Sequence, residues 1–478
     1  MARPTTRRLP IGAEPMTGGV SFRVWAPGHQ RVTVVYDESH AGSHNSFDLV
    51  ADEGGYFSGS DCEVKPEMKY WLRLDGGGPL LPDPASRCQP AGPTGPSQII
   101  DPADFDWHDS NWPGVPLSDQ VLYEMHIGTF TRAGSWEAAT AELVELAELG
   151  ITVIELMPVA EFPGDFGWSY DAANLFAPSH LYGSPDSMRQ FVDRAHALGL
   201  GVILDVVYNH LGRVGEQLLA SFTERYFSRR HTTEWGRAMN FDESDSEPVR
   251  EFLLANLRHW IDEYHLDGVR IDATQAFDDE SPKHILLELA QTAREAAGER
   301  AILVVGESEP QKASLFRSAA EGGCELDMIW SDDFHHAARV RLTGHSEAYY
   351  TDYTGTAEEF AAAARWGYLY QGQRYSWQKK GRGMPALDIQ PERFIHYLQN
   401  HDQVANSARG ERLHGLTSPG RLRAMTALLL LMPQTPLLFQ GQEFAASSPF
   451  LYFNDCGGDP AVAAGRAKFL AQFRSYAT

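Results

Sequence analysis

The pattern of apolar and polar residues divides the chain into two parts, with the change near Val121. Before this position, short segments rich in β-branched and aromatic residues alternate with clusters of glycine, proline and aspartate, which is typical of a β-sandwich. Segments of this kind are 20–25, 31–36 and 69–74. After Val121, apolar strands alternate with amphipathic helices, and this order indicates a parallel sheet covered by helices.

Eight segments of the second part have the length and apolar content of buried strands, and eight is the number that a closed barrel requires. They are 121–125, 151–156, 201–207, 268–272, 301–306, 327–330, 394–399 and 436–440. We therefore predict an α/β fold in which a (β/α)8 TIM barrel over 106–450 follows an N-terminal β-sandwich domain over 1–105. The long polar stretch 208–247 is expected to form an inserted loop or subdomain above the substrate. Residues 451–478 are expected to form a short or truncated C-terminal region.

Several helices of the second part carry boundary signals. Ser184 stands before Pro185 as an N-cap before a first-turn proline, and Gly199 ends the same helix. A helix that begins near Ser135 is expected to end at Gly150. A last helical stretch is predicted over 461–476.

The net charge of the chain indicates which kinds of partner it does not bind. With 40 basic and 64 acidic residues the formal net charge is −24, which argues against nucleic acid because phosphate binding needs concentrated positive charge. The most apolar stretch, 428–439, is interrupted by prolines and is shorter than the ~20 apolar residues of a membrane span. The first ten residues lack the apolar core of a signal peptide. We therefore expect a cytoplasmic protein without nucleic-acid or membrane partners.

The cysteines predict neither a disulfide framework nor a zinc site, because no two of them stand at a close spacing. They are Cys62, Cys88, Cys324 and Cys456. Reduced thiols are the expected state in the cytoplasm.

Two strands end in acidic residues with contrasting surroundings. Asp272 ends the strand 268–272, and Arg270 points the same way because strand side chains alternate between faces. A guanidinium beside this carboxylate should keep it ionised. Glu307 ends the next strand after purely apolar residues, which favours the raised pKa of a proton donor. This pair is the one that retaining glycoside hydrolysis needs, with ~5–5.5 Å between the two carboxyls.

Other strand ends add polar residues to the same rim, and each has a role that a sugar site would use. Asp402 would accept hydrogen bonds from sugar hydroxyls as the ring flattens, and His210 and His401 would bind hydroxyls of the same sugar. Tyr170 is suited to stack beneath a pyranose ring. A single strand-end acid is more often a helix cap. Several polar groups at one rim favour a ligand site, because their burial without a ligand would be costly.

Four of these segments resemble, in order, the signature regions of the α-amylase superfamily. They are 205–210, 268–272, 306–308 and 400–402. The resemblance implies a retaining mechanism on α-glucans, with Asp272 as nucleophile, Glu307 as acid/base and Asp402 as transition-state stabiliser. No metal or cofactor is expected, because two carboxylates suffice for this chemistry. The positions that bind glucose in the family are matched by Asp205, His210, Arg270, His401 and Tyr170.

Further segments narrow the resemblance within that superfamily. Residues 21–27 and 123–130 resemble branching and debranching enzymes, whereas 329–336 resembles the malto-oligosyltrehalose trehalohydrolase family. The latter implies cleavage of the α-1,4 bond next to a terminal trehalose, with Asp333 and His335 as contacts to trehalose. The expected partner is an α-glucan oligosaccharide that carries a terminal trehalose. The alternatives are a 1,4-α-glucan branching enzyme and a catalytically silent glucan-binding barrel.

Overall fold

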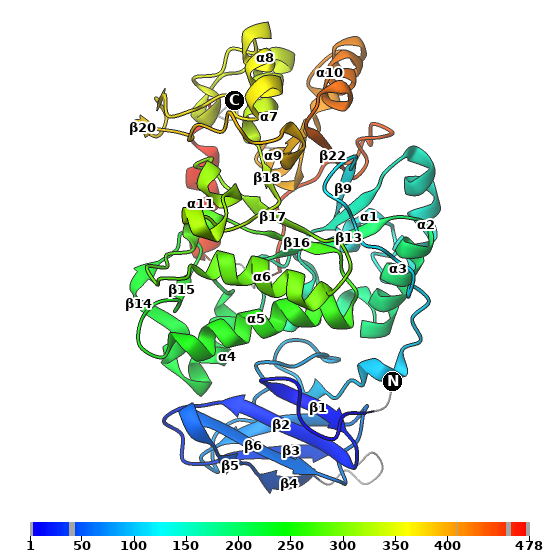
Figure 1. Ribbon diagram of the computed structural model, residues 1–478, viewed down its shortest axis with the longest axis vertical. Helices are drawn as coiled ribbons and strands as arrows, with labels where there is room; N and C mark the ends of the chain where they lie inside the picture. Colours follow the sequence, from blue (N-terminus) through cyan, green and yellow to red (C-terminus); the bar gives the residue numbers. More distant parts are fainter. Residues whose placement is uncertain (1–2, 38–43, 408, 456–459, 475–478) are drawn as a thin grey trace.

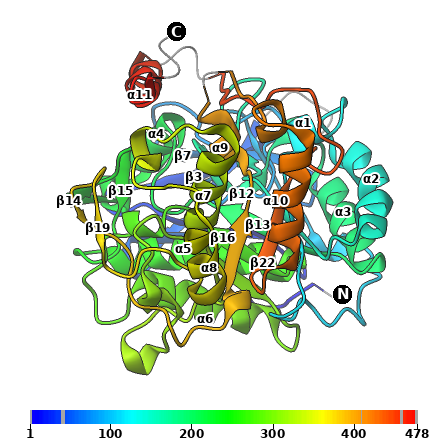
Figure 2. The ribbon, with the colours of Figure 1, turned by 90° about the horizontal axis from the view of Figure 1, so that it is seen from above.

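The computed structural model of the chain describes residues 3–37, 44–407, 409–455 and 460–474. Its centre is a closed barrel of eight parallel strands, each paired with the next along the chain and the last with the first (Figures 1 and 2). The strands are β9 Leu122–Met125, β10 Val153–Leu156, β13 Gly201–Val206, β16 Gly268–Ile271, β17 Leu303–Glu307, β18 Met328–Trp330, β21 Phe394–Tyr397 and β22 Thr435–Phe439. The predicted TIM barrel is therefore confirmed, with small shifts at the strand ends.

The N-terminal strands form two four-stranded antiparallel sheets below the barrel, as predicted for a β-sandwich (Figure 1). One contains β1 Gly12–Met16, β2 Gly19–Trp25, β6 Tyr56–Asp61 and β5 Val50–Ala51. The other contains β4 His44–Asp48, β3 Val32–Asp37, β7 Lys69–Leu74 and β8 Ser97–Gln98. Their inner faces meet through aromatic residues, and the rings of Phe22 and Tyr70 lie edge to face with centroids 5.1 Å apart.

Helices surround the barrel, and several begin and end where the sequence predicts. The longer ones are α2 Trp136–Leu149, α3 Pro185–Ala197, α4 Arg213–Phe222, α5 Ser246–Glu263, α6 Ile285–Ala297, α7 Asp332–Thr343, α8 Ala357–Trp366, α10 Pro419–Leu431 and α11 Pro460–Leu470. The short ones are α1 Ile127–Phe130 and α9 His401–Ala405. Ser184 caps α3 by accepting from the backbone of Ser187, and Gly150 closes α2 with a φ of 95°.

The last helix is shorter than predicted. It ends at Leu470 rather than near 476. Beyond it the backbone amides of Gln472 and Phe473 bond three residues back, to Phe469 and Leu470. The chain thus leaves the α-helix through the tighter turns that commonly satisfy a helix end.

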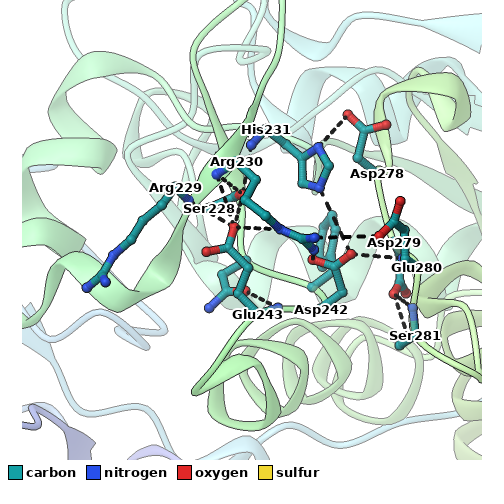
Figure 3. A network of polar contacts seen from close by, with 12 residues as sticks. Ser228, Arg229, Arg230, His231, Asp242, Glu243, Asp278, Asp279, Glu280 and Ser281 are labelled. Carbon is teal, nitrogen blue, oxygen red and sulfur yellow. Dashed lines mark hydrogen bonds and ion pairs between the residues drawn. The ribbon is translucent and has the colours of Figure 1, made fainter.

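The long segment after β13 contains α4 and a two-stranded hairpin of β14 Phe227–Thr232 and β15 Arg237–Met239. Arg230 of this hairpin forms an ion pair with Asp242, just after β15, at 2.8 Å, and its ion pair with Glu280 at 3.5 Å connects the hairpin to the segment that follows β16 (Figure 3). The backbone amide of Glu280 also donates to Asp242. Two further hairpins lie in loops of the barrel: β11 Ala160–Glu161 with β12 Asn174–Pro178, and β19 Arg374–Tyr375 with β20 Lys380–Gly381.

The side chains inside the barrel change from apolar to ionisable along the strand direction. A cluster of apolar residues fills the part nearer the amino ends of the strands. Different strands contribute its members Leu122, Val153, Ile203, Leu303, Met328, Ile395 and Leu437. Two residues further along three of these strands, and at Arg270 on β16, the side chains that face inward are ionisable, because strand side chains alternate. They are Glu124, Glu155, Asp205 and Arg270. The apolar layer therefore supports a buried layer of ionisable groups at the carboxyl ends of the strands.

Two kinds of feature are absent from the described part of the chain. Within it, every helix is too short or too polar to cross a membrane. Over the same residues, no group of three or more His, Cys, Asp or Glu side chains is arranged to hold a metal ion.

Candidate active site

Four of the predicted site residues meet at the carboxyl ends of three adjacent strands. One nitrogen of Arg270 on β16 donates to both oxygens of Asp205 on β13, at 2.9 and 2.8 Å. The same nitrogen donates to Asp272 at 2.8 Å, and the second nitrogen lies 3.0 Å from Glu307 at the end of β17. A single guanidinium therefore contacts three carboxyl groups, which places both members of the predicted catalytic pair against one cation.

The guanidinium is buried and packs against an aromatic ring. Arg270 is fully buried, and its central carbon lies 4.3 Å from the centre of the Trp330 ring, within cation–π range. Burial alone would lower the pKa of Arg270, but the surrounding carboxylates raise it well above its usual range. Arg270 is thus a permanent cation at the centre of the site.

The two predicted catalytic carboxyls titrate at raised pH. Burial raises the pKa of Glu307 to about 7, with Asp272 adding to the shift and Arg270 opposing it. Burial also raises the pKa of Asp272 above its usual value, although Arg270 donates a hydrogen bond to it. Arg270 therefore favours the ionised form of Asp272, whereas the loss of solvent on burial works against it.

The backbone directly after Asp272 is strained, and this strain positions a donor for Glu307. Ala273 has a φ of 44°, in the left-handed region that a residue with a Cβ seldom adopts. In this conformation its amide donates to a carboxyl oxygen of Glu307 at 2.9 Å. The hydroxyl of Thr274 donates to the backbone carbonyl of Glu307. The turn after β16 thus fixes the orientation of the acid on β17.

On the other side of Arg270 lie Tyr170, His401 and Asp402. The hydroxyl of Tyr170 is 2.6 Å from Asp205 and 2.9 Å from Nε2 of His401, and the two rings stack with centroids 5.2 Å apart. Asp402 lies in the first turn of α9, 3.7 Å from Nε2 of His401, with its side chain 44% exposed. The structure therefore brings Tyr170, His401 and Asp402 together with the Arg270 cluster.

His210 stands at the edge of this group. It is buried, its Nδ1 contacts Oδ1 of Asn209 at 2.8 Å, and burial lowers its pKa to about 4. Its ring stacks on Trp235 with centroids 5.6 Å apart. Trp235 belongs to the inserted hairpin and is 53% exposed, so it presents an aromatic face beside the site. The ion pairs of Figure 3 connect this hairpin to the segment 278–281.

The expectation that Asp333 and His335 contact sugar is not met. Asp333 is buried and accepts hydrogen bonds from the hydroxyl of Tyr353 at 2.5 Å and the amide of Leu369 at 2.6 Å. His335 is buried too, with its ring nitrogens on the carbonyl of Leu398 and the hydroxyl of Tyr350. Both side chains hold the following segments in place.

The reason lies in the local structure, because Asp333 and His335 belong to a helix. It begins α7 at Asp332, and consecutive helical residues point about 100° apart. Asp332, not Asp333, lies toward the rim: it accepts from the hydroxyl of Tyr397 and lies 3.5 Å from Arg382. Burial raises its pKa to about 7, although Arg382 lowers it.

Sequence reasoning missed three residues of this site. Glu124 accepts from the backbone amide of His401 at 3.0 Å and also bonds Nδ1 of the ring. Trp330 supports Arg270, and Asp332 adds a carboxyl beside Glu307. Glu124 and Trp330 belong to predicted strands, so extending the reading of strand ends to the first and sixth strands would have found them. Asp332 required knowledge of where α7 begins.

Comparisons with known proteins identify relatives of the chain. The family model of the α-amylase catalytic domain matches residues 102–236. The chain is 41% identical to a malto-oligosyltrehalose trehalohydrolase of Deinococcus radiodurans, over 98% of this chain and 76% of that protein. It is 39% identical to the enzyme of the same name from Saccharolobus solfataricus, over 94% of this chain and 77% of that protein. A solved structure of a putative α-amylase from Salmonella typhimurium superposes with a TM-score of 0.90 at 40% identity, over 97% of this chain and 79% of that chain.

Proposed function

Because the chain belongs to the malto-oligosyltrehalose trehalohydrolase family of α-amylase-type enzymes, we propose that it hydrolyses malto-oligosyltrehalose. The bond cleaved is the α-1,4-glucosidic bond next to the terminal α,α-trehalose, and the product is free trehalose. The observation that carries the mechanism is the contact of one guanidinium, that of Arg270, with both Asp272 and Glu307.

In the proposed reaction Asp272 attacks the anomeric carbon of the glucose next to trehalose, and a covalent glycosyl-enzyme forms as the bond to trehalose breaks. Glu307 donates its proton to the departing oxygen. It then takes a proton from the water that hydrolyses the intermediate. Two inversions at one carbon return the α configuration. This mechanism requires the two carboxyls ~5–5.5 Å apart.

The raised pKa of Glu307 supports its role as the acid. At about 7, it leaves a large fraction of the carboxyl protonated near neutral pH. Asp272 accepts a hydrogen bond from Arg270, which favours its ionised form relative to that of Glu307. The pair is thus suited to the division into a proton donor and an anionic nucleophile.

The remaining polar groups of the cluster are assigned to the sugar that is cleaved. Asp402 is partly exposed and is free to accept hydrogen bonds from hydroxyls, which strengthen as the ring flattens. His401, His210 and Tyr170 surround the same position. On the leaving-group side we place Asp332, because it follows the strand next to that of Glu307 and its charge acts on the same region.

The proposal is tested by product analysis after incubation with malto-oligosyltrehalose and, separately, with a plain malto-oligosaccharide of equal length. We expect free trehalose from the first and little change in the second. New α-1,6 branches in the second sample would assign the chain to the branching enzymes instead. The Asp272→Asn variant serves as the control for hydrolysis by contaminating enzymes.

A further inference from the structure

Two carboxyl side chains lie side by side inside the barrel, below the site and outside the mechanism described above. Glu124 on β9 and Glu155 on β10 occupy paired positions in the parallel register, and both are almost completely buried. Their surroundings differ. Glu124 bonds the backbone amide and the ring of His401, whereas both carboxyl oxygens of Glu155 lack a hydrogen-bond partner. One carboxyl is therefore committed to the site, and the other is not.

The hydrogen bonds around His401 fix the positions of its protons. Both oxygens of Asp205 accept from the Arg270 guanidinium, so this carboxyl is an acceptor. The hydroxyl of Tyr170, 2.6 Å from Asp205, must then give its only proton to that carboxylate. Tyr170 therefore acts as acceptor in its 2.9 Å contact with Nε2 of His401, and Nε2 carries a proton.

The contacts at Nδ1, on the opposite side of the ring, also indicate a protonated nitrogen. Nδ1 of His401 faces a carboxyl oxygen of Glu124, and the second oxygen of Glu124 already accepts from the amide of His401. The charge and hydrogen bond of Glu124 raise the pKa of His401, so the ring also holds a proton on Nδ1 and donates it to Glu124. With protons on both nitrogens, the ring is an imidazolium.

We propose that Glu124 is a positioning residue that holds His401 as an imidazolium and thereby fixes the charge and the Nε2–H donor that the ring presents to the sugar. This inference rests on the proposed function of the site. Through His401, Glu124 also determines the direction of the Tyr170 hydroxyl and so the bond between Tyr170 and Asp205.

Taken together, the ionisable groups around His401 favour the protonated ring. Glu124 and Asp402 favour the cation, and Arg270 opposes it. The other titratable neighbours stand on separate elements: His126 after β9, Glu155 on β10, Tyr170 in the loop before β12 and Asp205 on β13. Burial alone would lower the pKa of His401, but Glu124 and Asp402 raise it to about 9.

Glu155 provides a matched control for the experiment. Burial raises its pKa well above the usual value and Glu124 adds to the shift, so the carboxyl is neutral. Glu155→Gln therefore replaces one neutral, unpartnered group by another of the same size at the same depth. Glu124→Gln has the same size and burial but removes the charge that His401 faces.

The kinetic test compares kcat/KM of each variant with that of the wild type between about pH 5 and pH 7.5, as a ratio at each pH. All three proteins contain Glu307, so its titration changes kcat/KM of the variant and of the wild type alike and does not affect their ratio. In Glu124→Gln the imidazolium is lost as pH rises through the lowered pKa of His401. We expect its ratio to fall about tenfold between about pH 5 and pH 7.5. A tenfold change corresponds to one pH unit above the pKa of the titrating ring. The ratio for Glu155→Gln should stay level.

A level ratio for Glu124→Gln would overturn the proposal, since a purely structural defect would lower activity equally at all pH values. The second measurement needs no turnover: nitrogen NMR of protein labelled in histidine, with the His401 signals assigned by their loss in His401→Gln. We expect both ring nitrogens of the wild type to be protonated at about pH 8, where a free histidine is neutral.

A neutral His401 ring at that pH would contradict the proposal even if Glu124→Gln failed to fold. The two measurements also separate this proposal from the proposed function. If no trehalose were released but the ring were an imidazolium, the proposed function would fail and the assignment of Glu124 would stand.

Discussion

The guanidinium of Arg270 donates a 2.8 Å hydrogen bond to the carboxyl of Asp272, and the arginine is wholly shielded from solvent. Its other nitrogen lies 3.0 Å from Glu307. The planar fork of an arginine can serve two carboxyls at once, whereas the ammonium of a lysine is a single point. Arg270 therefore connects two neighbouring strand ends into one site.

The first prediction concerns this fork. Arg270→Lys keeps a positive charge but cannot contact Asp272 and Glu307 in the same geometry, so we expect kcat/KM to fall by about 100-fold or more. The matched control is Arg230→Lys, because Arg230 is a half-exposed residue of the network in Figure 3, and exposed ion pairs contribute little. Values of kcat/KM within twofold of each other for the two variants would remove Arg270 from its central role.

Asp272→Asn should abolish turnover while the protein still folds. The amide cannot form the glycosyl-enzyme, and the loss should reach about 10⁴-fold or more because the group acts mainly in the transition state. Steady-state kinetics and a thermal melt of the same sample check the two halves of the prediction. A substantial residual rate would rule out the covalent mechanism.

The pH dependence of kcat/KM follows from the two carboxyls. Glu307 must be protonated to donate, so activity should be lost as pH rises through about 7, the pKa of Glu307. Asp272 must be ionised to attack, so activity should also be lost as pH falls through its pKa, which burial places above the usual value for aspartate. The profile should be a bell with its alkaline limb near neutrality.

The variant Glu307→Gln tests whether the alkaline limb of the pH profile is caused by the titration of Glu307. The variant should lose cleavage of malto-oligosyltrehalose but keep cleavage of an α-maltosyl fluoride, whose leaving group needs no proton. With the fluoride as substrate, the alkaline limb near pH 7 should disappear. If that limb persisted in the variant, another group would be the acid.

Asp332 and Asp333 are adjacent in sequence and are predicted to respond in opposite ways. Asp333→Asn leaves two buried donors, the hydroxyl of Tyr353 and the amide of Leu369, without a full carboxylate acceptor. It should cost about 2–3 kcal/mol of stability. Asp332→Asn should leave the melting temperature almost unchanged and lower kcat/KM about tenfold, as expected for loss of one polar contact to substrate. A loss of stability alone in Asp332→Asn would make it a structural residue.

Much of this molecule could be predicted from its sequence, because the barrel repeats one simple unit. Buried parallel strands read as apolar runs, and the polar residue that ends each run stands out against them. Asp272 and Glu307 were visible for this reason, and the closed topology then brings their strands together.

What could not be predicted depends on contacts between distant segments. The partner of His401 is Glu124, 277 residues away, and no local pattern connects them. The choice between Asp332 and Asp333 depends on the residue at which α7 begins, and helix ends are the part of a helix that sequence fixes least well. The raised pKa of Asp272 likewise depends on burial in the finished barrel.

The measurement that tests the central claim most directly is a proton NMR time course of the reaction with malto-oligosyltrehalose. Its anomeric signals report the product and the stereochemistry together. We predict that free trehalose appears at the same rate as a new reducing end, and that this end is first formed as the α-anomer. Initial formation of the β-anomer would contradict the retaining mechanism at Asp272 and Glu307. Reducing ends formed without trehalose would contradict the proposed substrate.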